Sequence, residues 1–348
     1  MQWHTRYLNI NQAHKITKGS GVTVAVVDSG IYRHQDLVRN LKKGTDTVAG
    51  GDGSGQVDND GHGTNMAGII AGHGHNTDDG VLGIAPESSL IPVKSIGAQD
   101  NGLGLEEGIK WAAEAGADVI NVSTGGPRSR GIEEAIAAAV KADAVVVSAA
   151  GNRSQTLRLD YPAAMPEVLA VGATDRNGKV ADFSLTGPAV RICAPGVEIV
   201  TTDINDKYGK GSGTSEATAV VSGAAALVRA KFPELSAAEV VHRLTATADD
   251  NGPPGRDEQC GYGVLNVVKA LTADVPPLNP SGNGGSASPT PASSVEGSAS
   301  SGTGASPAVA APEPAGSNLP LLAGIGAAVV ALGTVLAFLV RRRRRGSS

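Results

Sequence analysis

Short apolar runs rich in β-branched residues recur along the chain, and stretches with helical periodicity separate them. The apolar runs cover residues 22–27, 90–96, 118–122, 144–148 and 168–171. Runs without regular polar positions are typical of strands whose two faces are both buried. The helical stretches cover residues 105–115, 132–142, 215–231 and 236–247. This alternation predicts an α/β fold, a doubly wound and mostly parallel sheet covered by helices on both faces.

The composition allows a large core, but one made of small side chains. Hydrophobic residues are 41% of the 348 residues, whereas aromatic residues are only 3%. A core of Ala, Val, Ile and Leu suits closely packed layers of helix and sheet.

The charge is distributed unevenly. Lys and Arg number 29 against 34 Asp and Glu, which gives a formal net charge of −5. Residues 341–345 are all arginine, so the rest of the chain carries a larger acidic excess than this net charge indicates. Such a domain lacks the basic surface that binding to nucleic acid requires, and we expect no nucleic-acid partner.

The sequence changes character after the last helical stretch of the predicted domain, residues 1–273. Residues 274–318 are rich in Pro, Ser, Gly, Ala and Thr, and we expect a flexible linker because they bury too little apolar surface to offset the entropy of ordering. Residues 319–340 are predicted to form a transmembrane helix, since the charge-free run 321–340 has the ~20-residue length that crosses a bilayer. The basic tail, 341–348, is expected to stay cytoplasmic, which puts the domain outside a single-pass cell membrane anchor.

The first residues are polar, and no secretory signal precedes the first apolar run. For a domain expected outside the membrane, this favours a start truncated before Met1 over export by the C-terminal anchor alone.

Three segments carry residues with catalytic potential. The run 22–27 ends at Asp28, at the strand tip where parallel sheets place their sites. His62 stands between two glycines before an apolar helical stretch, and an imidazole can act as a general base near neutral pH. Ser215 follows a Gly-rich turn at a predicted helix N-terminus, where backbone N–H groups suit a developing oxyanion. Taken singly, each has a structural alternative: a turn-forming aspartate, an exposed histidine or an N-cap serine.

Together these segments resemble the subtilisin-like serine proteases. The segment VAVVDSGI contains Asp28, GHGT contains His62 and GTS ends at Ser215, in the Asp–His–Ser order of the subtilisin triad. The similarity extends over residues 1–273. It implies the subtilisin-like fold and hydrolysis of peptide bonds by these three residues, and therefore protein or peptide substrates.

The resemblance implies roles for further residues. The segment SAAGN, which ends at Asn152, resembles the oxyanion-hole segment of the family, with the side-chain amide as donor. Ser123, Thr124 and Gly125 resemble the strand edge that pairs with an extended substrate. Glu216 departs from the family pattern, in which methionine is usual, and puts a carboxylate beside the nucleophile.

The chain has two cysteines, Cys193 and Cys260. They can form one disulfide in an oxidising compartment or remain separate buried thiols. Because the domain is expected outside the membrane, we predict the disulfide.

No cofactor is required by the chemistry that the resemblance implies. Asp36 resembles a calcium-ligand position of the family, but further ligands are not evident, so calcium is possible without being supported and we predict no metal site. His73, His75, Asp78 and Asp79 are interpreted as a solvated loop in preference to a metal site.

The arrangement of N-terminal QWH segment, linker, anchor and basic tail is similar to that of the mycosins. These are membrane-anchored subtilisin-like proteases associated with type VII secretion in actinobacteria, so the similarity implies secretion-channel components as partners. Two alternatives stay open: a general cell-surface protease, and a scaffold that stabilises a secretion complex with catalysis dispensable.

Overall fold

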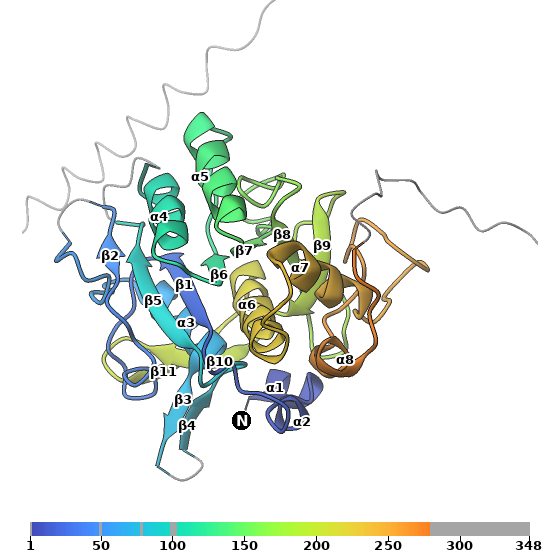
Figure 1. Cartoon of the computed structure of the whole chain (residues 1–348), viewed down its shortest axis with the longest axis horizontal. Helices are drawn as coiled ribbons and strands as arrows, with labels where there is room; N and C mark the ends of the chain where they lie inside the picture. Colours follow the sequence, from blue (N-terminus) through green and yellow to red (C-terminus); the bar gives the residue numbers. More distant parts are fainter. Residues whose placement is uncertain (1, 49–50, 77–78, 98–102, 279–348) are drawn as a thin grey trace, which may run out of the picture. The chain divides into compact units, whose positions relative to one another are not determined.

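A central sheet of seven strands organises the computed structural model, which describes residues 2–48, 51–76, 79–97 and 103–278 (Figure 1). The strand order is β2-β5-β1-β6-β7-β8-β9, and every pairing in this sheet is parallel. The strands of the sheet are β1 (Thr23–Asp28), β2 (Thr45–Asp46), β5 (Ser89–Lys94), β6 (Val119–Val122), β7 (Val145–Ala149), β8 (Leu169–Thr174) and β9 (Val190–Pro195).

Two antiparallel hairpins and eight helices complete the described elements. The hairpins are β3 (His73–His75) with β4 (Asp79–Leu82), and β10 (Ile199–Asp203) with β11 (Lys207–Gly211). The helices are α1 (Trp3–Tyr7), α2 (Ile10–Ala13), α3 (His62–Ala71), α4 (Leu103–Glu114), α5 (Arg130–Lys141), α6 (Thr214–Lys231), α7 (Ala237–Ala246) and α8 (Val267–Thr272).

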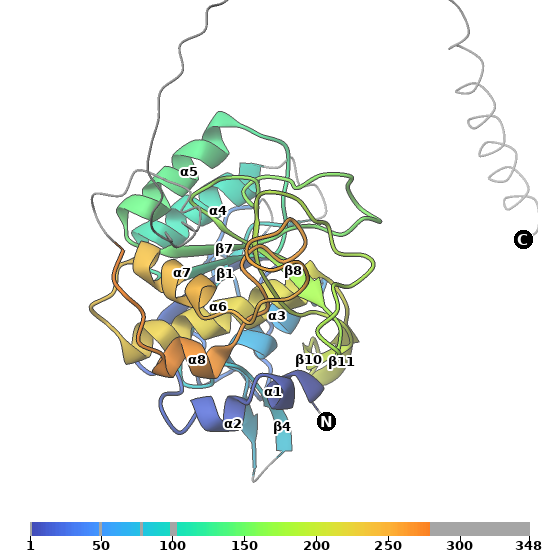
Figure 2. The same cartoon turned by 90° about the vertical axis from the view of Figure 1, so that its right-hand side faces the viewer.

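Both faces of the sheet are buried, as the continuous apolar runs predict. Along β1, Val24 and Val26 belong to a core shared with α3 and α6, whereas Ala25 and Val27 belong to a second core shared with α4 and α5. Figure 2 shows α4 and α5 on one side of the strands and α6 and α8 on the other. Alternate residues of one strand therefore serve opposite layers, which confirms the α/β fold with a parallel sheet between helices.

The central helix α6 is buried along most of its length because its side chains are small. At Gly223 a Cβ atom would lie 2.6 Å from the Cβ of Ile84, closer than two such atoms approach. Glycine there lets α6 lie directly against the chain that follows β4. A second sequence prediction on this side is also confirmed: Ser236 and Glu239 form a capping box at the start of α7.

The carboxyl ends of neighbouring strands bring distant segments together. Asp28 is the last residue of β1, and Val27 pairs with Val122 at the end of β6. Val122 in turn pairs with Ser148 near the end of β7. Since the strands are parallel, the segments that follow β1, β6 and β7 leave the sheet along one edge.

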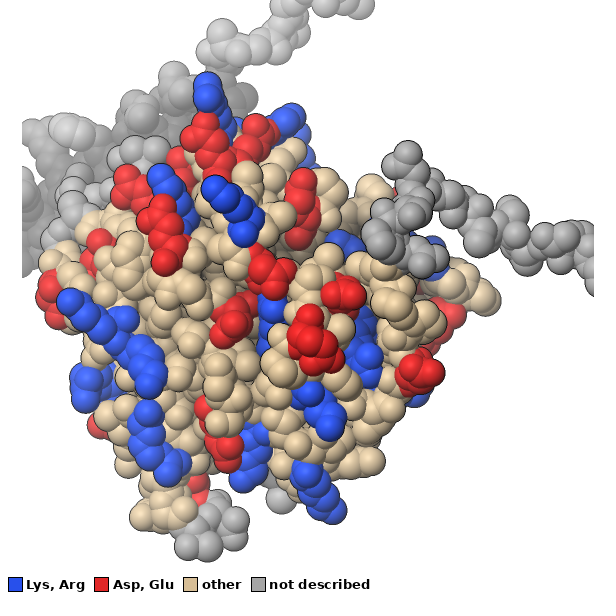
Figure 3. Space-filling view, in the orientation of Figure 1, with Lys and Arg blue, Asp and Glu red and all other residues tan. Residues whose placement is uncertain are grey.

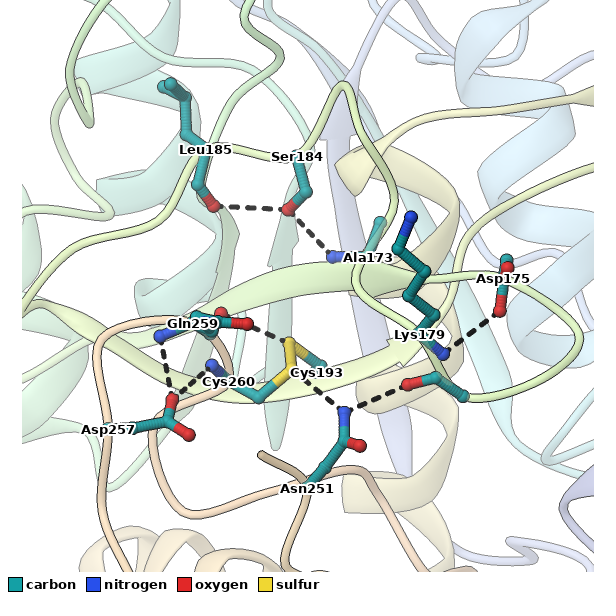
Figure 4. Close-up of a disulfide and its surroundings, with 11 residues drawn as sticks. Ala173, Asp175, Lys179, Ser184, Leu185, Cys193, Asn251, Asp257, Gln259 and Cys260 are labelled. Carbon is teal, nitrogen blue, oxygen red and sulfur yellow. Dashed lines mark hydrogen bonds between the residues drawn. A yellow bond between two sulfur atoms is a disulfide. The ribbon is translucent and has the colours of Figure 1, made fainter. Parts of the chain in front are cut away.

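A disulfide joins the last strand of the sheet to the C-terminal part of the domain (Figure 4). Cys193 lies in β9 and bonds to Cys260, 67 residues further along the chain. The loop around Cys260 is held by Asp257, whose carboxylate accepts hydrogen bonds from the backbone N–H groups of Gln259 and Cys260 at 2.7 and 2.9 Å. Both sulfur atoms are buried, so the bridge closes a small core of its own against Val264.

The membrane anchor, the linker and the basic tail of the sequence prediction lie outside the described residues, and the domain boundaries remain a prediction. Among the residues that the structure describes, no helix is both long and apolar enough to cross a membrane. On the face drawn in Figure 3, acidic and basic side chains are interspersed over the surface.

Candidate active site

The carboxylate at the end of β1 meets an imidazole at the start of α3. His62 Nδ1 lies 2.8 Å from Oδ1 and 2.9 Å from Oδ2 of Asp28, which is fully buried. The backbone N–H of Ser29 also donates to Oδ1, at 2.7 Å. With the carboxylate on Nδ1, the ring presents Nε2 away from Asp28, as a general base requires.

Glycine makes this approach possible. A Cβ on Gly63 would overlap the carbonyl oxygen of Gly30 and would lie 3.2 Å from the Cβ of Asp28. The missing side chain therefore lets the first turn of α3 lie directly against the end of β1. Gly61, which precedes His62, has a φ of +99°, a backbone conformation that favours glycine.

A second buried carboxylate, on Asp58, fixes the N-terminus of α3. Its Oδ1 accepts from the Gly61 N–H at 2.9 Å and the Ser29 hydroxyl at 3.0 Å. Its Oδ2 accepts from the N–H and hydroxyl of Thr64, at 3.0 and 2.6 Å. The sequence analysis missed this residue, although an aspartate just before a helix start is a typical capping signal.

Ser215 lies in the first turn of α6, and it lines one cavity together with His62. In the part of the chain that the structure describes, its hydroxyl donates to the carbonyl oxygen of Ser123 at 3.1 Å and not to His62. The Ser123 hydroxyl donates in return to the Ser215 carbonyl at 3.4 Å. The predicted nucleophile and base are thus neighbours whose mutual hydrogen bond is not formed.

Asn152 follows β7 and is oriented by the start of α6. Its Oδ1 accepts from the backbone N–H of Thr214 at 3.1 Å, and its Nδ2 donates to Gln155 at 3.1 Å. A Cβ placed on Gly213 would lie 3.4 Å from Nδ2 of Asn152 and 3.6 Å from the backbone nitrogen of Ser215. The amide nitrogen of Asn152 and the backbone nitrogen of Ser215 therefore lie near one point, and both residues line the cavity that contains His62.

The predicted substrate segment lines the same cavity, whose volume is about 350 Å³. Ser123, Thr124 and Gly125 form one wall, and the segment that ends at Asn152 forms another. The backbone beyond the first wall is held by a pair of hydrogen bonds between Gly126 and Tyr161, each of 2.9 Å. All predicted site residues except the buried Asp28 and the two cysteines lie at this cavity.

The electrostatics of the site are dominated by acidic groups. The Asp28 carboxylate raises the pKa of His62 to about 9 against the opposing effect of burial, and Glu216 and Asp60 act in the same direction as Asp28. Burial raises the pKa of Glu216. The imidazolium form of His62 is therefore favoured near neutral pH, and the ring can accept a proton only in its neutral form.

Asp36, the position compared with calcium ligands, is already engaged by protein donors. Its Oδ1 lies 2.5 Å from Nδ1 of His75, and its Oδ2 accepts from the Val81 N–H at 2.8 Å and the Tyr208 hydroxyl at 3.0 Å. Among the described residues, no three His, Cys, Asp or Glu side chains form a group that could hold a metal ion. As arranged, Asp36 does not fit a cation site, and His75 is paired with this carboxylate, so the solvated-loop interpretation is wrong for His75.

Comparison with known proteins adds independent support. The model of the subtilase family, Peptidase_S8, matches residues 19–263. Subtilisin DY of Bacillus licheniformis is 39% identical over 260 residues, which are 73% of this chain and 92% of that protein.

Solved structures lead to a narrower group. The crystal structure of MycP1 with the N-terminal propeptide removed has a TM-score of 0.72 at 33% identity and covers 80% of this chain and 99% of that one. The MycP3 protease from the type VII (ESX-3) secretion system has a TM-score of 0.69 at 33% identity, over 79% of this chain and 89% of that one. MycP1 and MycP3 are mycosins. With its parallel sheet, its Asp–His pair and these relatives, the chain belongs to the subtilase family and is a subtilisin-like serine endopeptidase with mycosins among its structural neighbours.

Proposed function

We propose that peptide bonds are hydrolysed at this cavity through an acyl-enzyme on Ser215. The observation that carries the proposal is that one cavity is bordered by Ser215, His62 and Asn152, with Asp28 buried behind the imidazole. Nucleophile, base and oxyanion donor are the three functions that acyl transfer needs.

The first step begins when the Ser215 hydroxyl leaves the Ser123 carbonyl and turns to Nε2 of His62. Its oxygen then bonds to the carbonyl carbon of the substrate while its proton passes to the imidazole. Asp28 keeps the ring oriented and stabilises the imidazolium. The side-chain amide of Asn152 and the backbone N–H of Ser215 donate hydrogen bonds to the oxyanion. The protonated His62 next donates to the leaving amine as the C–N bond breaks. Water then attacks the acyl carbon while His62 takes its proton, and His62 gives that proton to Ser215 Oγ as the ester bond breaks and the acid is released.

The substrate is an extended peptide that lies beside residues 123–125. A strand-like peptide can pair with the backbone of such a segment, which reads main chain and leaves specificity to the pockets for its side chains. Position 125 has room only for glycine as the residues are placed, because a Cβ there would lie 2.9 Å from the Cβ of Asp160.

Labelling of the full chain with a fluorophosphonate probe tests the chemistry. We expect one adduct, located on Ser215 by peptide mass spectrometry, and its loss in both Ser215→Ala and His62→Ala. An adduct that persists in Ser215→Ala, or a folded wild-type chain that does not react, would overturn the assignment.

We further propose that the protease works at the cell membrane in type VII secretion, with its domain outside and its basic tail in the cytoplasm. The charge-free run 321–340 followed by arginines supports the topology. The resemblance to MycP1 and MycP3 supports the secretion context.

Two experiments separate this role from its alternatives. In intact cells, an external protease that cuts the linker should release the soluble domain, whereas a domain protected until lysis would contradict outward topology. In a deletion strain, the Ser215→Ala chain should fail to restore secretion. Full restoration would favour the scaffold, and secretion that is unaffected by the deletion itself would favour a general surface protease.

A further inference from the structure

The residue that follows the proposed nucleophile is a buried glutamate. Glu216 lies in the first turn of α6 and is only 7% exposed. A Cβ on Gly211 would overlap its Oε1, and a Cβ on Gly213 would lie 2.8 Å from its Oε2. The carboxylate therefore folds back over residues 211–213, and it fits there because two of these positions lack side chains.

This carboxylate borders the same space as the oxyanion donors. The position of a Cβ on Gly213 is 2.8 Å from Oε2 of Glu216, 3.4 Å from Nδ2 of Asn152 and 3.6 Å from the backbone nitrogen of Ser215. An ionised Glu216 thus puts negative charge within about 6.5 Å of the two groups that are proposed to bind a developing negative charge.

The residues around Glu216 and the proposed oxyanion donors supply little compensating positive charge. Asp203 on β10 lies near the start of α3, since its Oδ1 would lie 2.7 Å from a Cβ on Gly61. Lys210, on β11, is paired instead with Glu198 at 3.3 Å. Among the described residues, the charged groups that act on His62 or Glu216 are Asp28 and Asp60, together with the two residues themselves. His62 is therefore the one cationic group there, within the described part of the chain.

We infer that Glu216 is a second carboxylate of the catalytic site that restrains the enzyme near neutral pH, because its buried negative charge lies beside the groups that bind the oxyanion. This inference rests on the proposed triad chemistry. Glu216 acts through His62 and the oxyanion donors and not by contact with substrate.

The sign of the pH effect follows from the base. His62 must be neutral to accept the Ser215 proton, so a negative neighbour that raises its pKa moves the acidic limb of kcat/KM to higher pH. Removal of the Glu216 charge should move that limb to lower pH by roughly 0.5–1 unit. On the alkaline plateau the change is smaller, because the same charge that opposes the oxyanion also stabilises the imidazolium formed during reaction.

The test compares Glu216→Gln with the wild-type full chain across the pH range. Glutamine keeps the size of the side chain and removes its charge. We expect kcat/KM near pH 7 to rise about three- to tenfold and the plateau to change less than about threefold. Glu114→Gln, which removes an exposed carboxylate from α4, is the matched control and should leave the profile unchanged.

A second measurement needs no activity. In the Ser215→Ala chain labelled with ¹⁵N-histidine, the His62 ring should titrate roughly 0.5–1 pH unit lower when Glu216→Gln is added. An acidic limb and a His62 titration that both stay in place would overturn the inference. If the chain hydrolysed no peptide, the proposed function would fail, but the titration would still decide whether Glu216 acts on His62.

Discussion

Two buried aspartates of this domain each pair with a partly exposed histidine, and the two pairs differ in their surroundings. Asp28 and Asp36 are both fully buried, and their carboxylates contact Nδ1 of His62 and His75 at 2.8 and 2.5 Å. Beyond His62 lies a cavity with a serine hydroxyl and an amide. In the second pair, by contrast, the other oxygen of Asp36 accepts hydrogen bonds from the Tyr208 hydroxyl and from the backbone N–H of Val81.

The difference teaches that the pair alone does not make a catalytic site. Both carboxylates orient a ring, but only the first ring has a nucleophile and oxyanion donors beside it. The second pair connects the β3–β4 hairpin to β11 through Tyr208, whose own pKa burial and Asp36 raise to about 12. We therefore interpret Asp28–His62 as catalytic and Asp36–His75 as a structural link.

The largest expected effect comes from removing the nucleophile. Ser215→Ala should lower kcat by about 10⁶-fold, the loss typical of subtilisins, while thermal unfolding changes little. Steady-state hydrolysis of a peptide substrate measures it. Ser154→Ala, an exposed serine close to the cavity, should keep its activity, and a comparable loss there would point to general damage.

A smaller effect is expected at the oxyanion site. Asn152→Ala should lower kcat by about 10²–10³-fold with little change in KM, because the amide is proposed to act only on the transition state. Gln155→Ala removes the neighbour that Asn152 Nδ2 contacts but not the donor. If both variants lost activity equally, Asn152 would be a loop-orienting amide instead.

The disulfide should matter for stability and not for catalysis. Replacing both Cys193 and Cys260 by serine should lower the free energy of unfolding by about 2–4 kcal/mol and leave kcat/KM at 25 °C unchanged. Thermal unfolding of the purified chain measures the loss. Intact mass before and after reduction supplies the control, and two free thiols in exported protein would contradict the bridge.

The smallest expected effect falls on the structural pair. Tyr208→Phe removes one hydrogen bond to Asp36 and should cost about 0.5–1.5 kcal/mol of stability at unchanged kcat/KM. Tyr262→Phe, at an exposed tyrosine far along the chain, should cost less. A loss of activity in Tyr208→Phe would mean that the two regions are coupled.

The sequence predicted the sheet and the candidate triad because both depend on local patterns. Continuous apolar runs marked β1, β6 and β7, and three short motifs identified Asp28, His62 and Ser215. The hairpin β10–β11 was missed, since its second strand, KYGKG, is largely exposed and has no apolar run.

Contacts between distant segments could not be predicted in this way. The Asp36–His75 pair joins residues 39 apart, and the hydrogen bond from Ser215 to Ser123 spans 92 residues. Neither has a local pattern, because each depends on where the sheet brings loop ends together. The fold of Glu216 over Gly211 and Gly213 likewise follows from packing, although its unusual position beside the nucleophile was visible in the sequence.

Substituting each aspartate of the two pairs tests the central distinction most directly. Asp28→Asn and Asp36→Asn, assayed side by side at a temperature where both stay folded, should differ sharply. We expect Asp28→Asn to lower kcat by about 10⁴-fold, as in other triad proteases, with little effect on thermal unfolding. Asp36→Asn should keep kcat/KM within about threefold and lower the free energy of unfolding by about 1–3 kcal/mol. Equal losses of activity in the two variants, or an active Asp28→Asn enzyme, would contradict the account.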